Sequence, residues 1–197
     1  MLRRSILALG LTAAVVPGFA TAAARRGWKT IFDGKSLKGW SPIGEANWSL
    51  KDGAVEADKG AGGFLVSDGT YGDFEARAEF WVSADANSGV FIRCTNPTTI
   101  SAGKTGNAYE VNIFDTRPDQ TYATGGIVDV GKVSPVPKTG GRWNVMEIRA
   151  EGDVFTVSVN GVKTVDKAKD SLHAHGRIAL QYGSGVVKFR KVQVREI

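Results

Sequence analysis

Residues 74–82 read FEARAEFWV and carry the clearest structural signal in the chain. Every second residue, starting with Phe74, is apolar, whereas the residues between them include two glutamates and an arginine. Successive side chains of a β-strand point to opposite faces, so this alternation predicts a strand with one face in a core and the other in water. Glu79 and Trp81 lie on the wet face, where they could join a ligand site or a lattice of cross-strand ion pairs.

Two further stretches, 87–93 (NSGVFIR) and 109–115 (YEVNIFD), show the same alternation. In the second, Glu110 and Asn112 share the face opposite to three apolar or aromatic residues, and in the first Arg93 faces away from two β-branched residues. If the two strands are neighbours, a carboxylate, an amide and a guanidinium project from one sheet face. Such a trio forms either a ladder of solvated ion pairs or a binding surface, and the pattern alone leaves both open.

The loop from Cys94 to Ala108 separates these two strands and contains Lys104. Long loops inside compact domains are often functional, which favours a rim of a binding site with Lys104 among the ligand contacts. Cys94 is the only cysteine, so no intramolecular disulfide is available. Alternation turns its side chain away from Arg93 and toward the core, which predicts a buried, inert thiol.

Hairpin turns occur on both sides of these central strands. Asp-Gly at 52–53 and Asn-Gly at 160–161 lie between alternating segments and are typical of two-residue turns with positive φ. With 25 glycines and no helical period outside the first 24 residues, the chain is predicted to be all-β. A series of short strands between glycine-rich turns is typical of a double-layer jelly roll.

Three local details of the strands are also predicted. A strand at 64–66 is expected to end at the Asp-Gly of 68–69, and residues 166–174 are expected to form a loop. The apolar phase shifts between Phe189 and Val192, which predicts a β-bulge.

Residues 1–24 have the order of an export signal. Arg3 and Arg4 precede an apolar stretch at 6–16 and small residues suited to cleavage. The apolar stretch is about half the roughly 20 residues that a membrane-spanning helix needs, so a membrane anchor is not expected. The mature chain, 25–197, is then predicted to be one domain in the periplasm or outside the cell, exported by either the general or the twin-arginine route.

Charge and histidine content argue against two classes of partner. The formal net charge is +5, falls by two with the signal, and is evenly spread, so no nucleic-acid partner is expected. His173 and His175 are the only histidines, and two ligands before a glycine make a weak metal signal. Solvated loop histidines are the favoured interpretation.

Nine short motifs follow one another along the mature chain: FDGKSLxGW (32–40), WxxxDG (48–53), YGDFE (71–75), NSGVFIR (87–93), YEVxIxD (109–115), WN (143–144), NG (160–161), LQ (180–181) and FR (189–190). Together, from about Trp28 to Val194, they resemble the signature of the 3-keto-disaccharide hydrolase-like family. The resemblance implies the concanavalin A-like lectin/glucanase fold, a jelly-roll β-sandwich.

The resemblance also implies a carbohydrate substrate whose C3 hydroxyl has been oxidised to a ketone. A base removes the acidified hydrogen at C2, the group on C1 leaves by elimination, and hydration completes the cleavage. On this basis Glu110 is expected to be the base or acid, and Arg93 the partner of the developing oxyanion. Asp115 would bind a substrate hydroxyl or a divalent cation, Ca²⁺ or Zn²⁺, and Asn112 and Gln181 would bind sugar hydroxyls.

Two alternatives remain beside the keto-glycoside enzyme, which ranks first. Residues 110–115 also resemble the Glu-x-Asp-x-x-Glu of laminarinase-like glucanases, with Glu110 and Asp115 as the catalytic pair and Asn112 in place of the helper carboxylate. The other alternative is a non-catalytic carbohydrate-binding module, in which Trp81 or Trp40 stacks on a sugar.

Overall fold

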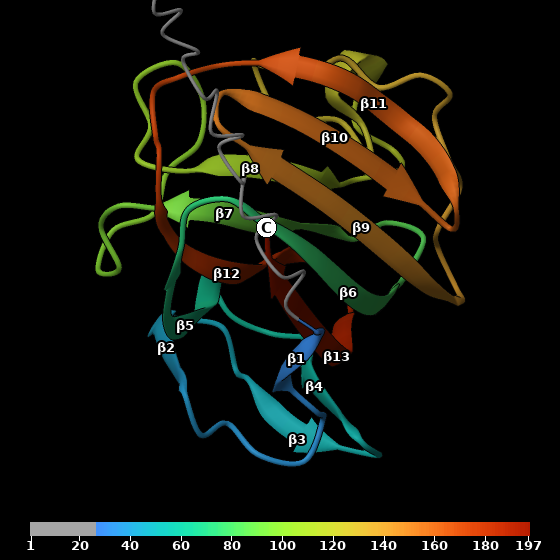
Figure 1. Cartoon of the computed structure of the whole chain (residues 1–197). Coiled ribbons are helices and arrows are strands. Elements are labelled where there is room, and N and C mark those ends of the chain that lie inside the picture. The colour runs from blue at the N-terminus through green and yellow to red at the C-terminus, as the bar shows by residue number, and fades with distance from the viewer. Residues whose placement is uncertain (1–26) are drawn as a thin grey trace, which may run out of the picture.

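The computed structural model describes residues 27–197, and the export signal predicted at 1–24 lies outside them. These residues form thirteen strands and one short 3₁₀ helix, η1 (Gln120–Tyr122) (Figure 1). The strands are β1 (Lys29–Phe32), β2 (Trp40–Gly44), β3 (Ser49–Lys51), β4 (Ala54–Ala57), β5 (Gly63–Tyr71), β6 (Phe74–Val82), β7 (Asn87–Cys94), β8 (Tyr109–Ile113), β9 (Trp143–Glu151), β10 (Val154–Val159), β11 (Val162–Lys169), β12 (Gly176–Ser184) and β13 (Val187–Glu196). Within this part of the chain, no helix is both long and apolar enough to span a bilayer.

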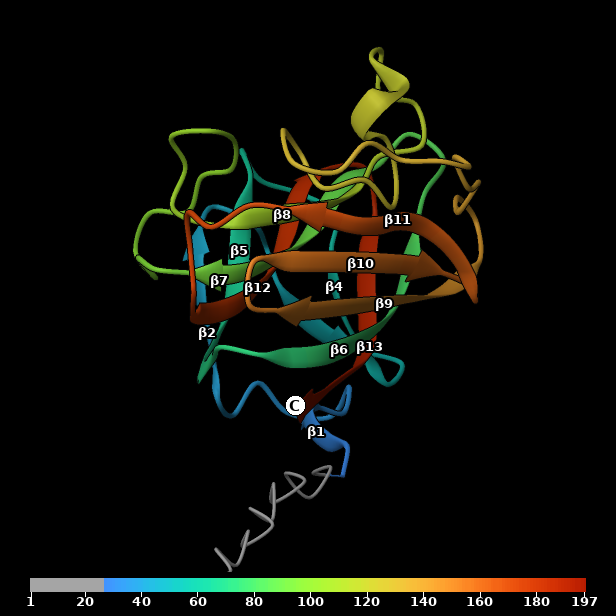
Figure 2. The ribbon, with the colours of Figure 1, turned by 45° about the horizontal axis from the view of Figure 1, so that its top comes forward.

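The strands pair into two antiparallel sheets that lie face to face (Figure 2). Sheet A has eight strands in the order β11-β10-β9-β6-β13-β4-β3, with β1 also paired to β13. Sheet B has five strands in the order β2-β5-β12-β7-β8. The predicted all-β jelly-roll sandwich is confirmed.

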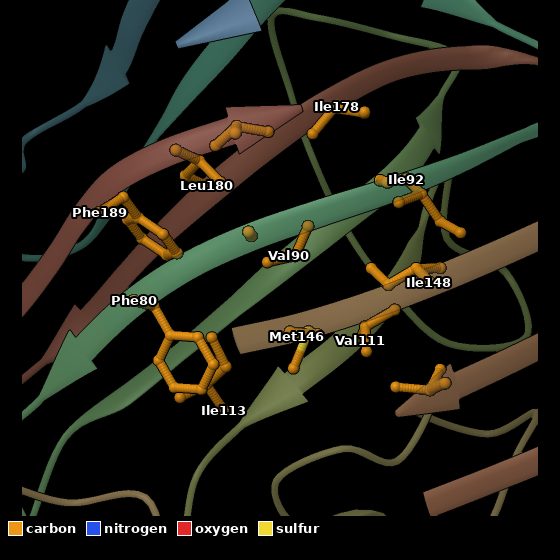
Figure 3. Packing of buried hydrophobic residues seen from close by; sticks show 14 of the residues in the cluster. Phe80, Val90, Ile92, Val111, Ile113, Met146, Ile148, Ile178, Leu180 and Phe189 are labelled. Atoms are coloured by element: carbon orange, nitrogen blue, oxygen red, sulfur yellow. The ribbon is translucent and has the colours of Figure 1, made fainter. Parts of the chain in front are cut away.

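The core lies between the two sheets (Figure 3). Phe80, Met146 and Phe189 come from sheet A and pack toward Val90 and Leu180 of sheet B, all of them buried. The alternation in 74–82 is realised as predicted, because the five apolar residues of β6 are buried and the four between them are partly exposed. Close packing of these side chains fixes which face of each sheet remains outside.

The two predicted hairpin turns and the predicted bulge are present. Asp52 and Asn160 both have positive φ, 50° and 52°, and the glycine after each does too. In β13, Phe189 pairs with Phe80 and Lys191 with Glu79, so Arg190 is the extra residue of a bulge.

Two predicted strand ends are wrong, for the same reason. β5 continues through the Asp-Gly of 68–69 to Tyr71, and β11 continues through 166–169. In each case the register shifts within the strand, between Val66 and Thr70 opposite β12 and between Val165 and Ala168 opposite β10. Polar residues at an irregular point inside a strand resemble a loop in sequence, although the pairing resumes beyond them.

Cys94 is buried, as predicted, but not in the main core. It belongs to a second apolar cluster on the outer face of sheet B, and burial raises the pKa of its thiol to about 12. The other buried members are Val66, Phe91, Ala108 and Ala179. Ile100 and Ala102 of the 95–108 loop pack against this cluster, so the loop covers part of the outer face of sheet B.

Candidate functional site

The outer face of sheet B, turned away from sheet A, carries the polar residues predicted on β8. Cross-strand pairing arranges the side chains of this face in two rows. The first row consists of Glu110, Phe91, Ala179 and Val66, and the second of Asn112, Gly89, Gln181, Phe64 and Ile43. The candidate site is the polar end of these rows, where β8, β7 and β12 lie side by side.

Gly89 of β7 allows the polar side chains of its two neighbouring strands to approach. A Cβ atom on Gly89 would lie 3.3 Å from Cγ of Glu110 and 3.4 Å from Oε1 of Gln181. It would also lie 3.2 Å from Cε2 of Phe91. Because glycine has no side chain, Glu110 and Gln181 converge above the backbone of β7, and Phe91 forms the adjacent apolar wall.

Glu110 is a carboxylate held largely out of water. Burial raises its pKa to about 7, and the positive charge of Arg117 opposes this shift without cancelling it. A carboxyl group with this pKa exchanges protons readily near neutral pH, which is the property that a general base or acid requires.

Three buried polar atoms near Glu110 have no hydrogen-bond partner within residues 27–197: Oδ1 of Asn112, Oε1 of Gln181 and Nε of Arg117. Asn112 is held in place because its Nδ2 donates to the carbonyl oxygen of Tyr122 at 2.6 Å, and its Oδ1 is left without a donor. Buried polar groups without partners are costly, so they commonly mark positions where a ligand supplies the missing hydrogen bonds. Two acceptors and one cationic donor suit a polyhydroxylated ligand.

A cavity of about 390 Å³ adjoins Gln181 on the side away from Glu110. Ile43 of β2, Phe64 of β5 and Ile100 of the 95–108 loop contribute its apolar walls. Thr98 also lines it, so the loop borders this cavity. Lys104 is exposed in the same loop and does not line this cavity.

The expectation that Arg93 shares a face with Glu110 is wrong. Arg93 is buried, only 1% exposed, and its guanidinium carbon lies 5.2 Å from the ring centre of Phe155, a core residue of sheet A. Its side chain therefore enters the space between the sheets, while Glu110 faces outward.

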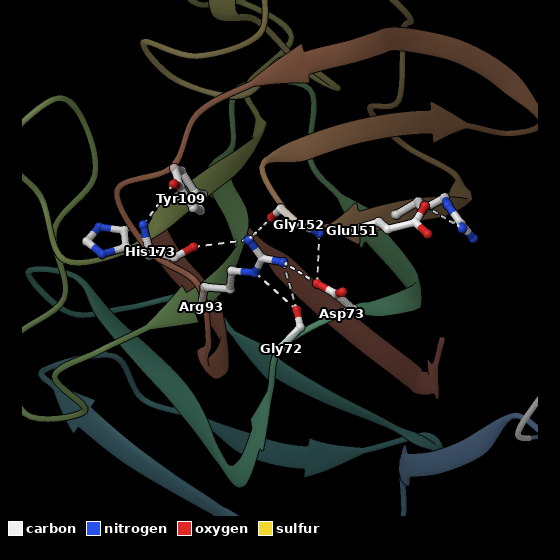
Figure 4. A network of polar contacts seen from close by, with 8 residues as sticks. Gly72, Asp73, Arg93, Tyr109, Glu151, Gly152 and His173 are labelled. Carbon is white, nitrogen blue, oxygen red and sulfur yellow. Dashed lines mark hydrogen bonds and ion pairs between the residues drawn. The ribbon is translucent and has the colours of Figure 1, made fainter. Parts of the chain in front are cut away.

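Every N–H of the Arg93 guanidinium has a partner in the protein (Figure 4). Nε and Nη2 donate to the carbonyl oxygen of Gly72, and Nη1 donates to those of Gly152 and His173. Nη2 also contacts Asp73 Oδ1 at 3.2 Å. Arg93 thus ties three chain reversals together at one end of the sandwich, and it has no donor left for a ligand.

An extra residue in β7 reverses the expected direction of Arg93. Residues 177 and 179 of β12 pair with 94 and 91 of β7, so β7 has one more residue than β12 over this stretch. Arg93 has a positive φ of 51°. This bulge turns the Arg93 side chain inward and restores Cys94 to the outer face, which simple alternation does not predict.

The carboxylate of Asp115 is fully hydrogen-bonded to other residues of the protein. Its carboxylate accepts hydrogen bonds from the hydroxyl of Thr124, the hydroxyl and backbone N–H of Thr139, and the backbone N–H of Gly140. Burial alone would raise the pKa of Asp115, but these hydrogen bonds outweigh it and hold the pKa below its ordinary value. Asp115 is therefore placed to fasten the loop after β8, and its oxygens are not directed at a ligand.

The residues near Asp115 and Glu110 do not fit the expected divalent cation. Asp115 already accepts four hydrogen bonds, and residues 27–197 contain no cluster of three or more His, Cys, Asp or Glu suited to a metal ion.

The solvated-loop interpretation is wrong for His173, which is 8% exposed and whose Nε2 lies 3.1 Å from the carbonyl oxygen of Gly106. His175 is exposed.

Glu79 and Trp81 lie on the other sheet and do not reach Glu110. Both are on the outer face of sheet A, where Arg190 donates to Glu79 at 2.6 Å and the Lys188 ammonium lies 5.2 Å from the ring centre of Trp81. The ion-pair lattice is the correct interpretation for this face. Its remaining members include Glu75, Arg77, Glu147, Arg149 and Arg195.

Arg117 is the functional candidate that sequence reasoning did not select. It lies in the loop after β8, two residues beyond Asp115, and it is the cation that acts on the pKa of Glu110. The only signal for it in the sequence is its position in a loop after the central strand. Alternation cannot place a side chain in such a loop.

Comparison with known proteins identifies related sequences and folds. Residues 27–195 match the family model of the 3-keto-alpha-glucoside-1,2-lyase-like domain. A 3-keto-disaccharide hydrolase of Bacteroides thetaiotaomicron is 33% identical over 105 residues, which cover 47% of this chain and 36% of that protein. The match therefore spans little more than a third of the length of that relative.

Solved structures with the same architecture include a proposed glycosyl hydrolase of Parabacteroides distasonis. Its TM-score is 0.68 at 24% identity, over 87% of this chain and all of that one. The carbohydrate-binding module CBM66 of Bacillus subtilis has a TM-score of 0.58 at 15% identity, over 85% of this chain and 94% of that one. At these identities the likeness establishes a shared fold.

Proposed function

Because the chain belongs to the 3-keto-alpha-glucoside-1,2-lyase-like domain family, we propose that it cleaves 3-keto glycosides with Glu110 as the base. The observation that carries the proposal is the state of Glu110 on the outer face of sheet B. Its pKa of about 7 suits proton transfer near neutral pH, and the unpartnered buried atoms of Asn112, Gln181 and Arg117 lie in the same region.

The proposed reaction has two stages. The ketone at C3 acidifies the hydrogen on C2, and the Glu110 carboxylate takes it as a proton, which leaves the electron pair in an enolate. Collapse of the enolate restores the ketone, forms a C1–C2 double bond and breaks the bond from C1 to the leaving oxygen, which acquires a proton. Water then adds across the double bond, so the net products are a 3-keto sugar and an alcohol.

The other site residues are assigned by the groups they offer. Arg117 takes the role that was expected of Arg93, because a guanidinium can stabilise the negative charge that develops on the ketone oxygen. Asn112 Oδ1 and Gln181 Oε1 accept hydrogen bonds from sugar hydroxyls. These contacts would orient C2 toward Glu110, which is the main requirement for an efficient proton transfer.

The glucanase alternative is weaker, because it requires a protonated carboxyl group as the general acid. Asp115 would have to supply that proton, yet its pKa is lowered and its carboxylate is fully hydrogen-bonded. The binding-module alternative is a second candidate, because the unpartnered amide oxygens of Asn112 and Gln181 would suit sugar hydroxyls without any chemistry.

The deciding experiment compares a 3-keto glycoside with its unoxidised parent, under the same conditions and with the same purified protein. Cleavage of the keto form alone supports the proposal. Cleavage of the parent supports the glucanase alternative, and binding of either compound without cleavage supports the binding module.

We also propose that the protein is exported and works without residues 1–24, on the evidence of the charged, apolar and small residues in that order. Amino-terminal sequencing of the protein recovered from cells tests this proposal. A mature protein that still begins at Met1 would contradict it.

A further inference from the structure

We propose that the cavity beside Gln181 binds the leaving group of the substrate, and that this group is an apolar aglycone. The inference rests on the function proposed above, since it assumes that the sugar itself lies at Glu110. It adds the class of compound that the sugar is attached to, and this class differs from the second sugar in the name of the Bacteroides relative.

The cavity surface is mixed, and its larger part is apolar. Ile43, Phe64 and Ile100 contribute side chains to its walls, and none of its lining residues carries a formal charge. The side-chain hydrogen-bonding groups at its edge include the hydroxyl of Thr98 and the amide of Gln181. Pockets for apolar ligands have this composition, with a few polar groups that fix the orientation.

Phe64 is a fixed part of this surface. Its ring meets that of Phe91 edge to face, with ring centres 5.0 Å apart and planes at 81°. Phe91 is 2% exposed and belongs to the apolar cluster beneath the 95–108 loop. A preorganised aromatic wall loses little conformational entropy when a flat ligand packs against it.

The register of sheet B makes the cavity a continuation of the site. Asn112, Gly89, Gln181, Phe64 and Ile43 occupy successive strands in one row. Neighbouring strands are about 4.8 Å apart, and Phe64 is one strand spacing from Gln181 and three from Asn112. A sugar seated between Glu110 and Gln181, above Gly89, therefore has the cavity directly beside it.

A second sugar is a poorer match to the same surface. Its ring would bring several hydroxyl groups that need hydrogen-bond partners, and burying them without partners costs binding free energy. The side chains of Ile43, Phe64 and Ile100 cannot supply those partners, which leaves Thr98, Gln181 and the backbone of the lining residues to do so. An aromatic or alkyl aglycone incurs no such cost.

The test measures binding separately from turnover. Dissociation constants are determined for the 3-keto forms of methyl glucoside, phenyl glucoside and a glucose disaccharide, in both anomeric configurations, using Glu110→Gln so that cleavage does not interfere. The phenyl compound is expected to bind about tenfold more tightly than the methyl compound, because its ring is buried against Phe64. The unoxidised phenyl and methyl glucosides, titrated into the unaltered protein, give a second measurement of the same preference.

Ile100→Thr removes apolar surface from the cavity wall and is expected to abolish most of the phenyl preference. Val162→Thr is the matched control, since Val162 is 51% exposed at the β10–β11 turn of the other sheet. Equal affinity for the phenyl and methyl compounds, tighter binding of the disaccharide, or no measurable binding of the phenyl compound would each overturn the inference. If the protein cleaves 3-keto glycosides but shows no preference for the phenyl compound, the aglycone inference is wrong and the proposed reaction stands. If it prefers the phenyl compound but cleaves none of them, the proposed reaction is wrong and the apolar binding site stands.

Discussion

Arg93 and Glu110 lie on opposite sides of sheet B, although β7 and β8 are neighbouring strands. Glu110 pairs across the strands with Phe91, whose side chain also faces outward, and the bulge after Phe91 turns Arg93 into the space between the sheets. The two groups that the sequence pattern joins in one site therefore have separate roles. Arg93 holds the end of the sandwich together, and Glu110 lies on the outer face of sheet B.

Arg93→Met is expected to destabilise the fold without changing the chemistry. The substitution leaves the carbonyl oxygens of Gly72, Gly152 and His173 without their donor, and losing one partner of a buried polar network typically costs about 3–5 kcal/mol in the free energy of unfolding. Denaturant unfolding measures the loss. Arg190→Met is the control, because it breaks an exposed ion pair and should cost about 1 kcal/mol or less. A variant as stable as the parent would contradict this role.

Glu110→Gln is expected to reduce turnover of a 3-keto glycoside by about 10²–10⁴, the range typical of losing a general base. Glutamine keeps the shape of the side chain, so substrate affinity should change much less. Steady-state kinetics and thermal unfolding are measured on the same preparation. Glu79→Gln, on the other sheet, serves as the control and should leave turnover unchanged. Turnover of the Glu110 variant within a few-fold of the parent would end its assignment as the base.

The rate of cleavage is expected to depend on pH through Glu110. Burial raises its pKa to about 7, so the carboxyl group is protonated in more acidic solution and cannot accept the C2 proton. The value of kcat/KM should therefore rise with pH through about 7 and level off above it. A profile that is flat between pH 5 and pH 9 would be incompatible with this pKa.

The same group should affect stability in the opposite direction. Between its ordinary value of 4.5 and about 7, the folded protein retains the proton that the unfolded chain has lost, so the free energy of unfolding falls as the pH rises across this window. Glu110→Gln should lack this part of the pH dependence. Melting temperatures of both proteins at pH 5 and pH 8 provide the comparison.

Asp115→Asn is expected to weaken the attachment of the loop after β8. The substitution removes the charge that receives four hydrogen bonds, and the free energy of unfolding should fall by about 1–3 kcal/mol at pH 7. Because the pKa of Asp115 is lowered in the folded protein, its contribution is present above the ordinary value of 3.8 and is lost as the pH falls further. The difference between parent and variant should therefore shrink in acid. A difference that stays constant down to pH 2 would mean that the charge is not responsible.

Carbohydrate binding is expected to depend on the outer face of sheet B and not on that of sheet A. Gln181→Ala removes an acceptor from the site and should weaken binding of a 3-keto glycoside about five- to tenfold, the equivalent of one hydrogen bond. Trp81→Ala, on sheet A, should change it less than about twofold, because Trp81 contacts Lys188 of its own sheet. Calorimetric titration of both variants checks this. A larger effect at Trp81 than at Gln181 would move the site to the other sheet.

The bulges at Arg190 in β13 and at Arg93 in β7 show which parts of the fold the sequence pattern predicts and which it does not. At Phe189–Val192 the apolar residues on both sides are out of phase, so the extra residue Arg190 is visible in the pattern. At Arg93 the extra residue is itself charged, and its partners are backbone carbonyl oxygens from three distant turns. Periodicity records apolar burial, so a buried charge that is satisfied by backbone groups leaves no trace in it.

The candidate site is predicted in part for a similar reason. Glu110, Asn112 and Gln181 lie on regular strands, where alternation and pairing place them on one face. Arg117 and the cavity wall at Ile100 lie in loops, whose positions depend on contacts between segments far apart in the sequence. Asp115 shows the converse, since its place at a strand end suggests a ligand contact while its four donors come from residues nine or more positions away.

β1 pairs with β13, and this pairing fixes the side of the molecule from which an attachment before Trp28 extends. Lys29 pairs with Val194 in sheet A, and the Trp28 ring packs against Arg77 and Arg195, whose guanidinium carbons lie 4.8 and 4.9 Å from the ring centre. A linker, a fused protein or a solid support joined there is anchored at the layer opposite to Glu110. Glu110 then faces the bulk solution, so immobilisation through the amino-terminal side should leave the encounter rate with dissolved glycosides nearly unaffected.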